Sequence, residues 1–356
     1  MYYSPVNDSS SRVTLFEAIR NGVSADGQLY LPVQFPVLPS AFFHNIASLS
    51  LTEIAYVALN MLFGDDIPSE ELREISLAAL KDFEIPFKST GENSYALDLT
   101  KGPTGSYHDF SARILAEYFR RMKPDRKLNV IVITNGNAAN ATADAFTAIP
   151  DCKVYALYPK DELSYSRRGQ LLLRDNVVPV EVGGNYSDCR RITLETILNK
   201  DVTENTLTIT ANSENLAILL PRIIYFFYAY ARLALMRRNL DNVVIEFETA
   251  HLGNLTAAVI AEKMGMPACR LYARFSDNRE TDSNVIMPRI VQLLNDELTV
   301  ESLIESAKIP PRPDETVVRL ITQAPVEPQA VPRDKTKKII HIGTSSAPLV
   351  RHLLAD

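Results

Sequence analysis

Short apolar runs rich in β-branched residues, separated by segments long enough for a helix, most strongly limit the folds open to this chain. The runs lie at residues 130–134, 153–158, 177–182, 207–210, 243–247, 270–275 and 339–342. Apolar strands that alternate with helices predict parallel strands covered by helices on both faces. We therefore expect an α/β fold.

The length of the chain indicates more than one lobe. At 356 residues it exceeds the size at which a single hydrophobic core stops growing. We predict a mainly helical N-terminal region over residues 1–98, a first α/β lobe over residues 99–235 and a second α/β lobe over residues 236–356. The prolines of residues 310–333 indicate an extended connection that leads to the last strand.

Two helix starts in the N-terminal region are marked by capping boxes. In this pattern a hydroxyl and a carboxylate three residues later each cap the other residue's backbone N–H group. Thr14 with Glu17 and Ser50 with Glu53 have the required spacing. We therefore expect helices to begin directly after Thr14 and Ser50.

Composition argues against several functions. A net charge of −6 without a basic stripe disfavours nucleic-acid binding, which clustered Lys and Arg drive. Cys152, Cys189 and Cys269 are far apart and fit neither a disulfide framework nor a zinc site. They indicate a reducing compartment. Because the first residues do not resemble a secretory signal, we expect a cytoplasmic protein.

One apolar stretch, residues 216–235, is long enough to be compared with a membrane span. Pro221, Arg222 and Arg232 interrupt it. We therefore predict a helix buried between the lobes and no membrane association.

The loops that follow three of the predicted strands are the expected places for chemistry, because sheets of this kind bind ligands beyond the carboxyl ends of their strands. These loops come after Ile133, Phe247 and Ile342. The first carries Asn135 and Asn137. It either holds an anion on its backbone N–H groups and the helix N-terminus or is an ordinary strand–helix turn. With a single glycine it does not match a dinucleotide fingerprint.

The second loop, residues 249–254, also leads from a predicted strand to a helix and suits a phosphate. Its His251 has three interpretations: a donor to an anion, a surface residue, or a metal ligand together with His108 and Asp109. Because these side chains lie on distant loops without ligand spacing, we expect no metal site. A nearby cluster at residues 212–215, Asn-Ser-Glu-Asn, is typical of a helix N-cap.

Several motifs, taken in order, resemble those of one enzyme family. Residues 102–110 read Gly-Pro-Thr-Gly-Ser-Tyr-His-Asp-Phe and are similar to Gly-Pro-Thr-x-x-Phe-Lys-Asp-Phe of threonine synthases. Further similarity lies at residues 22–32, 63–68, 157–160 and 212–220. Threonine synthases convert O-phosphohomoserine and water to threonine and phosphate. The resemblance implies the two-lobed tryptophan-synthase-β-like architecture of fold type II pyridoxal-phosphate (PLP) enzymes, with a mainly helical N-terminal extension.

The departures from the family motifs concentrate in the cleft between the implied lobes. His108 stands where the family lysine forms the Schiff base with PLP, and an imidazole cannot form that imine. Residues 249–254 read Thr-Ala-His-Leu-Gly-Asn where the family has (Thr/Ser)-Gly-Asn-Phe-Gly-Asn, the loop that cradles the cofactor phosphate. Ile218 takes the place of an arginine that would suit an anionic substrate.

The resemblance also implies a set of site positions. The catalytic positions are His108 and Asp109, and the degenerate cofactor positions are Asn135, Asn137, Thr249, His251, Gly253, Asn254 and Thr344. Thr344 matches a family residue expected near the pyridine nitrogen. Its loop, residues 343–348, either presents hydroxyl groups to a ligand or only starts the last helix, and we favour the second interpretation.

Loss of the lysine removes a covalent anchor and a proton shuttle, and general acid–base catalysis of this kind contributes about 10²–10⁴-fold. We therefore expect a pseudoenzyme of the threonine-biosynthesis family that binds no PLP covalently. Its implied partners are a small anionic metabolite, a second copy of itself or a related synthase. One alternative is rewritten chemistry at His108 beside Asp109. Another is an atypical PLP-dependent synthase or lyase in which Lys101 or Lys160 reaches the cleft.

Overall fold

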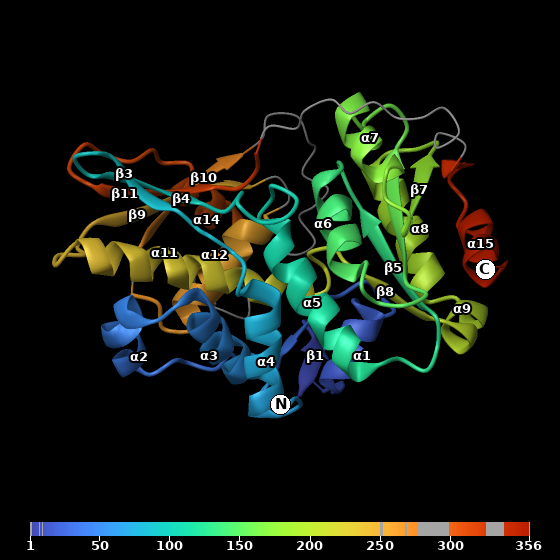
Figure 1. Ribbon diagram of the computed structural model, residues 1–356, viewed down its shortest axis with the longest axis horizontal. Coiled ribbons are helices and arrows are strands. Elements are labelled where there is room, and N and C mark those ends of the chain that lie inside the picture. Colours follow the sequence, from blue (N-terminus) through green and yellow to red (C-terminus); the bar gives the residue numbers. More distant parts are fainter. Residues whose placement is uncertain are drawn as a thin grey trace.

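Two five-stranded sheets form the two lobes of the protein (Figure 1). The structure is a computed structural model. It describes the chain except for residues 1, 7, 9, 250, 251, 268, 276–298, 325–337 and 356. Helices pack on both sheets, which confirms the expected α/β fold.

The first sheet is parallel throughout and has the strand order β12-β7-β6-β5-β8. Its strands are β5 (Leu128–Ile133), β6 (Lys153–Pro159), β7 (Val177–Val182), β8 (Leu207–Thr210) and β12 (Ile340–Ile342). The helices of this lobe are α5 (His108–Met122), α6 (Asn137–Phe146), α7 (Tyr165–Leu172), α8 (Tyr186–Ile197), α9 (Lys200–Asn205) and α15 (Ala347–Ala355). Every residue of β5 and β8 is buried, because helices cover both faces of the sheet.

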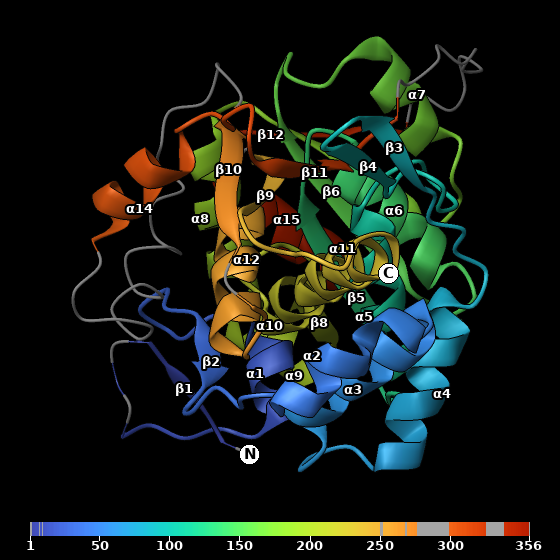
Figure 2. The same ribbon diagram turned by 90° about the vertical axis from the view of Figure 1, so that its left-hand side faces the viewer.

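The second sheet has the order β10-β9-β11-β4-β3, and its β3 runs antiparallel to β4. Its strands are β3 (Phe87–Gly91), β4 (Ser94–Asp98), β9 (Val243–Thr249), β10 (Arg270–Phe275) and β11 (Thr316–Ile321). Its helices are α11 (Ile223–Met236), α12 (Gly253–Lys263) and α14 (Val300–Ala307). Figure 2 shows α14 on the outer side of β10 and α12 next to β9.

The N-terminal segment packs beneath the second lobe and reaches the first (Figures 1 and 2). It contains β1 (Tyr3–Pro5) paired with β2 (Tyr30–Pro32), and the helices α1 (Leu15–Asn21), α2 (Ser40–Asn45), η1 (Ile46–Ser48), α3 (Leu51–Phe63) and α4 (Ser69–Leu80). Both predicted capping boxes are confirmed, at Thr14 before α1 and at Ser50 before α3.

The apolar stretch that could be compared with a membrane span is a core element. It forms α10 (Leu216–Leu219), η2 (Leu220–Arg222) and α11. Of the helices in the described part of the chain, this run alone is long and apolar enough to cross a bilayer, and 83% of its most apolar window is buried inside the protein. The prediction of a buried helix is confirmed.

All of the strands predicted from the sequence are present, but two segments join a different sheet from the one that the predicted division implied. The hairpin β3–β4 lies in the region predicted to be mainly helical, residues 1–98, but it belongs to the second sheet. Strand β12 lies in the region predicted to form the second lobe, but it pairs with β7 of the first sheet. The proline-rich connection contains β11, a central strand between β9 and β4. Strand pairing between distant segments decides sheet membership, and a linear pattern does not contain that information. The boundaries at residues 98 and 235 stay a prediction.

Candidate functional site

A cavity of about 520 Å³ lies where strands of both sheets end. Its lining residues follow strands or begin helices: Thr134 after β5, Ala211 after β8, Thr322 after β11, His108 at the start of α5, Asn137 at the start of α6 and Gly253 at the start of α12. In open α/β sheets this edge is where ligands bind. Strand ends and helix N-termini therefore converge on one space.

Two of the three loops singled out from the sequence line this cavity. They are the loops after Ile133 and Phe247. The loop after Ile342 does not contribute, because β12 is an edge strand that β7 and β6 separate from β5. Thr344 therefore lies outside the cavity lining. Its carbonyl oxygen accepts a hydrogen bond from Arg191 Nη2 at 2.6 Å.

His108 lines the cavity at the start of α5, beside the ring of Tyr107, and the two ring centroids are 4.2 Å apart. The chain just after β11 fixes this turn. The Tyr107 N–H donates to the Thr322 carbonyl at 3.0 Å, and Ser106 forms an isolated bridge with Gln323. The position of His108 in the cleft is therefore set by a segment more than 200 residues away in the sequence.

Asp109 does not line the cavity and is fully buried. Its two carboxylate oxygens accept hydrogen bonds from the backbone N–H of Thr104 at 3.0 Å and from Thr104 Oγ1 at 2.7 Å. Burial raises the pKa of this carboxyl, and the two bonds from Thr104 oppose that shift. A Cβ at Gly102 would lie 2.6 Å from Asp109 Oδ2, so glycine is needed for this packing. Asp109 therefore holds the turn before α5 from outside the cavity lining.

Thr134 organises the loop between β5 and α6. Its Oγ1 accepts hydrogen bonds from the N–H groups of Gly136 at 2.8 Å and Ala139 at 3.2 Å, so it caps the start of α6. Gly136 has a φ of 113°, and a Cβ there would lie 2.6 Å from Arg167 Cβ. These local contacts agree with the second interpretation given from the sequence, an ordinary strand–helix turn.

Asn135 and Asn137 line the cavity, and Asn137 connects the two lobes. Asn137 Nδ2 donates to Gln323 Oε1 at 2.8 Å, and Arg167 Nη1 donates to the Asn135 carbonyl at 3.2 Å. Because Gln323 follows β11, the bond from Asn137 crosses from the first lobe to the second, whereas the bond to Asn135 stays within the first.

Arg222 is the most deeply buried charge of the cavity wall, with 4% of its surface exposed. Its Nη2 donates to Ser213 Oγ at 2.8 Å, and its Nη1 donates to Asn254 Oδ1 at 3.3 Å. Its Cζ lies 5.4 Å from the ring centroid of Tyr107. Asn254 is fixed in turn by the Tyr225 hydroxyl, which donates to its Oδ1 at 2.8 Å.

The other arginines of the wall are paired with carboxylates. Arg190 pairs with Glu214 at 3.2 Å. Arg191 pairs with acidic residues of its own helix, α8. Arg274 pairs with Glu246 at 3.1 Å and contacts Glu248 at 3.4 Å. Among the described residues, Arg222 alone of these four arginines has no ion pair.

Thr249 ends β9 and lines the cavity with 4% of its surface exposed. Its hydroxyl oxygen is buried and has no hydrogen-bond partner in the described part of the chain. A buried hydroxyl without a partner is costly, and a polar atom of a bound ligand would satisfy it. His251, the remaining predicted position of this loop, lies outside the described residues.

The cluster at residues 212–215 combines local and functional roles. Asn215 is the N-cap of α10, which confirms the N-cap interpretation, and Asn212 forms a double hydrogen bond with the backbone of Ile133 at 2.9 and 2.8 Å. Ser213 and Glu214 line the cavity and bind its arginines.

Sequence reasoning did not predict the cationic side of this site. In the sequence, the only local signal of Arg222 is that it interrupts an apolar run. Arg190, Arg191 and Arg274 have no local signal, because they reach the cavity only through the packing of α8 and β10. Ile218, at the expected arginine position, is buried and does not line the cavity.

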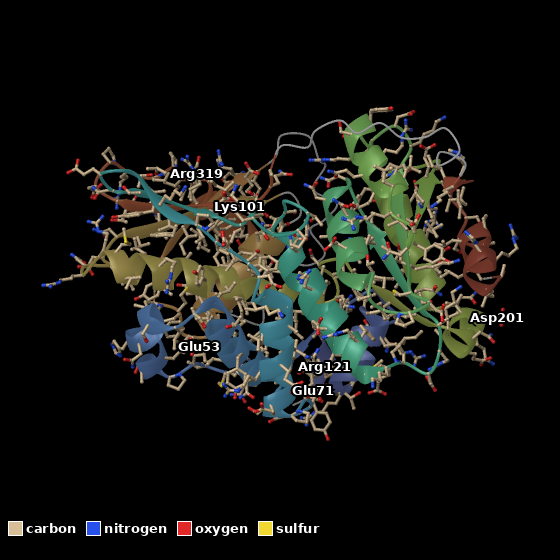
Figure 3. All side chains as sticks on the ribbon, viewed as in Figure 1. Glu53, Glu71, Lys101, Arg121, Asp201 and Arg319 are labelled. Carbon is tan, nitrogen blue, oxygen red and sulfur yellow. The ribbon has the colours of Figure 1, made fainter. Side chains whose placement is uncertain are left out.

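No lysine in the described part of the chain lines the cavity. Lys101, labelled in Figure 3, pairs with Asp98 at 3.5 Å and has 55% of its side chain exposed. Lys160 is exposed as well. An imine to an aldehyde requires a primary amine at the reacting carbon. The described residues therefore do not fit PLP held as a Schiff base.

This two-lobed fold, with its cavity at the facing strand ends, is the architecture of fold type II PLP proteins. A family model described as threonine synthase N terminus matches residues 1–80. Threonine synthase of Haemophilus influenzae is 28% identical over 311 residues, which are 87% of this chain and 71% of that protein. In sequence, over most of its length, the chain is therefore similar to threonine synthases.

Two solved structures show the likeness of the whole fold. Threonine synthase from Escherichia coli superposes with a TM-score of 0.85 at 20% identity, over 100% of each chain. A PLP-bound threonine synthase from Brucella melitensis superposes with a TM-score of 0.74 at 17% identity, over 99% of this chain and 98% of that one. In sequence, the match to the Escherichia coli enzyme covers 65% of that enzyme's length.

Proposed function

We propose that this protein is a threonine-synthase-like pseudoenzyme whose cavity binds a small anionic metabolite and forms no covalent bond with PLP. One observation carries the proposal: the 520 Å³ cavity has a buried, unpaired Arg222 in its wall and no lysine among its described lining residues. A cavity that keeps an anion-binding charge but lacks the reactive amine supports binding without the family reaction. We also propose that the protein acts in the cytoplasm, alone or with a second copy or a related synthase.

Two alternatives have less support. Chemistry at His108 assisted by Asp109 requires both side chains in the cavity, but Asp109 is buried against Thr104. PLP chemistry through another lysine requires an amine that reaches the cavity, and Lys101 and Lys160 lie on the surface.

Borohydride trapping tests the absence of a Schiff base. Purified protein is mixed with PLP, its absorbance in the aldimine region is recorded, and borohydride then reduces any imine before peptide mapping. We expect no saturable band and no uniquely modified peptide. The variant His108→Lys is the matched comparison, since it restores an amine to the cavity wall. A stoichiometric adduct on one lysine of the wild-type protein would refute the proposal.

Thermal unfolding with small ligands tests the binding role. We expect at least one small anion to raise the melting temperature of the wild-type protein in a saturable way, because a ligand that binds only the folded state stabilises it. Melting temperatures that stay unchanged with carboxylates, phosphates and nucleotides alike would remove the metabolite-binding part of the proposal.

A further inference from the structure

The arrangement around Arg222 narrows the class of ligand. Arg222 lies against the start of α12, and a Cβ at Gly253 would stand only 2.5 Å from Arg222 Nη1. The guanidinium therefore occupies the space that glycine leaves open at the first turn of this helix. The N-cap of α12, Leu252, provides no side-chain hydrogen bond to that turn.

The guanidinium has unused hydrogen-bonding capacity. Arginine has five N–H donors. Two bonds from Arg222 are made within the described part of the chain, to Ser213 and Asn254, so the fork keeps donors for a further acceptor. The hydroxyl of Thr249 is a second buried group of the cavity wall without a partner among the described residues. The cavity wall thus has two independent groups with unused hydrogen-bonding capacity, the Arg222 guanidinium and the Thr249 hydroxyl.

The charge balance of the wall indicates the charge of the ligand. The carboxylates of Glu214, Glu248 and the α8 acids offset Arg190, Arg274 and Arg191. Counted over side chains, one positive charge, that of Arg222, is left uncompensated among the described lining residues. A single carboxylate matches this excess. A phosphate monoester carries about −1.5 to −2 charges, so part of its charge would be buried without compensation.

We propose that Arg222, with Ser213 and Thr249 beside the start of α12, forms a subsite for a single carboxylate group of a small metabolite. This inference rests on the proposed function, since it names the ligand class of the same cavity. The fork binds the two carboxylate oxygens side by side, a geometry that arginine provides and lysine does not.

The test compares carboxylate with phosphate probes on matched variants of the full chain. The probes are L-serine and succinate as carboxylates, and inorganic phosphate and phosphoethanolamine as phosphates without a carboxylate. The variants are Arg222→Gln and Arg222→Lys. Arg238→Gln is the control, because it removes the same charge from an exposed residue that does not line the cavity. Calorimetric titration gives the affinities, and circular dichroism checks folding.

We expect a carboxylate probe to bind the wild-type protein and the control equally, and to bind Arg222→Gln about 10- to 100-fold more weakly, the effect of losing hydrogen bonds to a charged group. Arg222→Lys, which keeps the charge but not the fork, should also bind more weakly. It serves as the test variant if Arg222→Gln fails to fold.

Each other outcome is decisive. Equal carboxylate binding by wild type and Arg222→Gln would overturn the subsite but leave metabolite binding in place. Binding of phosphoethanolamine that depends on Arg222, without carboxylate binding, would overturn the ligand class and again leave the proposed function in place. No binding of any probe by the wild-type protein would overturn both.

Discussion

Two arginines at opposite ends of the second sheet differ in their partners. Arg270 begins β10 at the amino end and forms two hydrogen bonds, of 2.9 and 2.6 Å, with Glu315, which is 3% exposed. Arg222 lies near the carboxyl ends of the strands, is 4% exposed, and has no carboxylate partner in the described part of the chain. In the Arg270–Glu315 pair, each charge offsets the desolvation cost of the other. A buried charge without a partner destabilises the fold unless a ligand of opposite charge binds to it. At the amino end of the sheet, the Arg270–Glu315 pair stabilises the fold. At the carboxyl end, Arg222 remains available to bind a ligand.

The largest predicted effect comes from breaking the structural pair. Arg270→Gln should lower the free energy of unfolding at neutral pH by about 2–3 kcal/mol, because Glu315 is left buried without its main partner. Urea denaturation of wild type and variant measures the difference, and Arg238→Gln serves as the control. If Arg270→Gln lowers the unfolding free energy by less than Arg238→Gln does, the Arg270–Glu315 pair does not stabilise the fold.

This effect should also depend on pH. The hydrogen bonds from Arg270, followed by those from Arg312, lower the pKa of Glu315 from 4.5 to about 2. A carboxyl whose pKa is lower in the folded state stabilises the protein above its unfolded pKa and loses this contribution as the pH falls through its folded pKa. The stability difference between wild type and Arg270→Gln should therefore be complete above pH 4.5 and shrink toward pH 2.

The same substitution at the other arginine should act in the opposite direction. Arg222→Gln removes a buried unpaired charge while an amide can still bond Ser213 or Asn254, so we expect the unfolding free energy of the ligand-free protein to rise by about 1 kcal/mol. Urea denaturation without ligand tests this sign. A loss as large as that for Arg270→Gln would mean that Arg222 is structural, and the contrast between the two ends would disappear.

A smaller effect is expected from adding one methyl group beside the same guanidinium. Gly253→Ala places a Cβ 2.5 Å from Arg222 Nη1, the far end of a flexible side chain, so Arg222 should move while the fold is kept. Stability should change by less than about 1 kcal/mol, because alanine is favoured over glycine in a helix by a similar amount. The affinity for a carboxylate probe should fall. Unchanged affinity in calorimetry would show that the position of Arg222 does not matter for binding.

The smallest effect is expected at Asp109, which is buried but outside the cavity. Asp109→Asn should leave the affinity for carboxylate probes unchanged and alter the unfolding free energy by less than about 1 kcal/mol, since the amide can still bond Thr104. Burial raises the pKa of Asp109, so ionisation of this carboxyl lowers the stability of the wild-type protein as the pH rises through that pKa. The unfolding free energy of Asp109→Asn should therefore increase relative to that of the wild type over the same pH range. If this variant no longer bound the carboxylate probes, Asp109 would have a role in the binding site.

Much of the fold could be predicted from periodicity. Parallel, buried strands such as β5 and β8 are apolar throughout, and their runs are recognisable without partners. By contrast β11 includes the exposed Arg319 and lies among prolines, so its central place in the sheet was not recognised. The half-exposed hairpin β3–β4 was missed for the same reason, because partly polar strands depend on their neighbours for stability.

The candidate site was predicted only where it is continuous in sequence. Asn137 and Gly253 are predicted because each stands in a loop that leads from a strand to a helix, and His108 is predicted because its motif resembles that of threonine synthases. The family resemblance also implies Asp109 as a site position. Successive residues at a helix start point in different directions, however, and the Asp109 carboxylate accepts its hydrogen bonds from Thr104.

The order of residues determined the elements of this protein and its similarity to threonine synthases, since both depend on short-range patterns: apolar runs, capping boxes and motifs in sequence. The resemblance of residues 102–110 to the threonine synthase motif also predicts that His108 stands in place of the family lysine. Only the tertiary structure decided which charges are left unpaired in the cavity. Arg222, Ser213 and Thr249 come from three separate segments, and whether a buried charge has a partner depends on distances across the fold rather than along the chain.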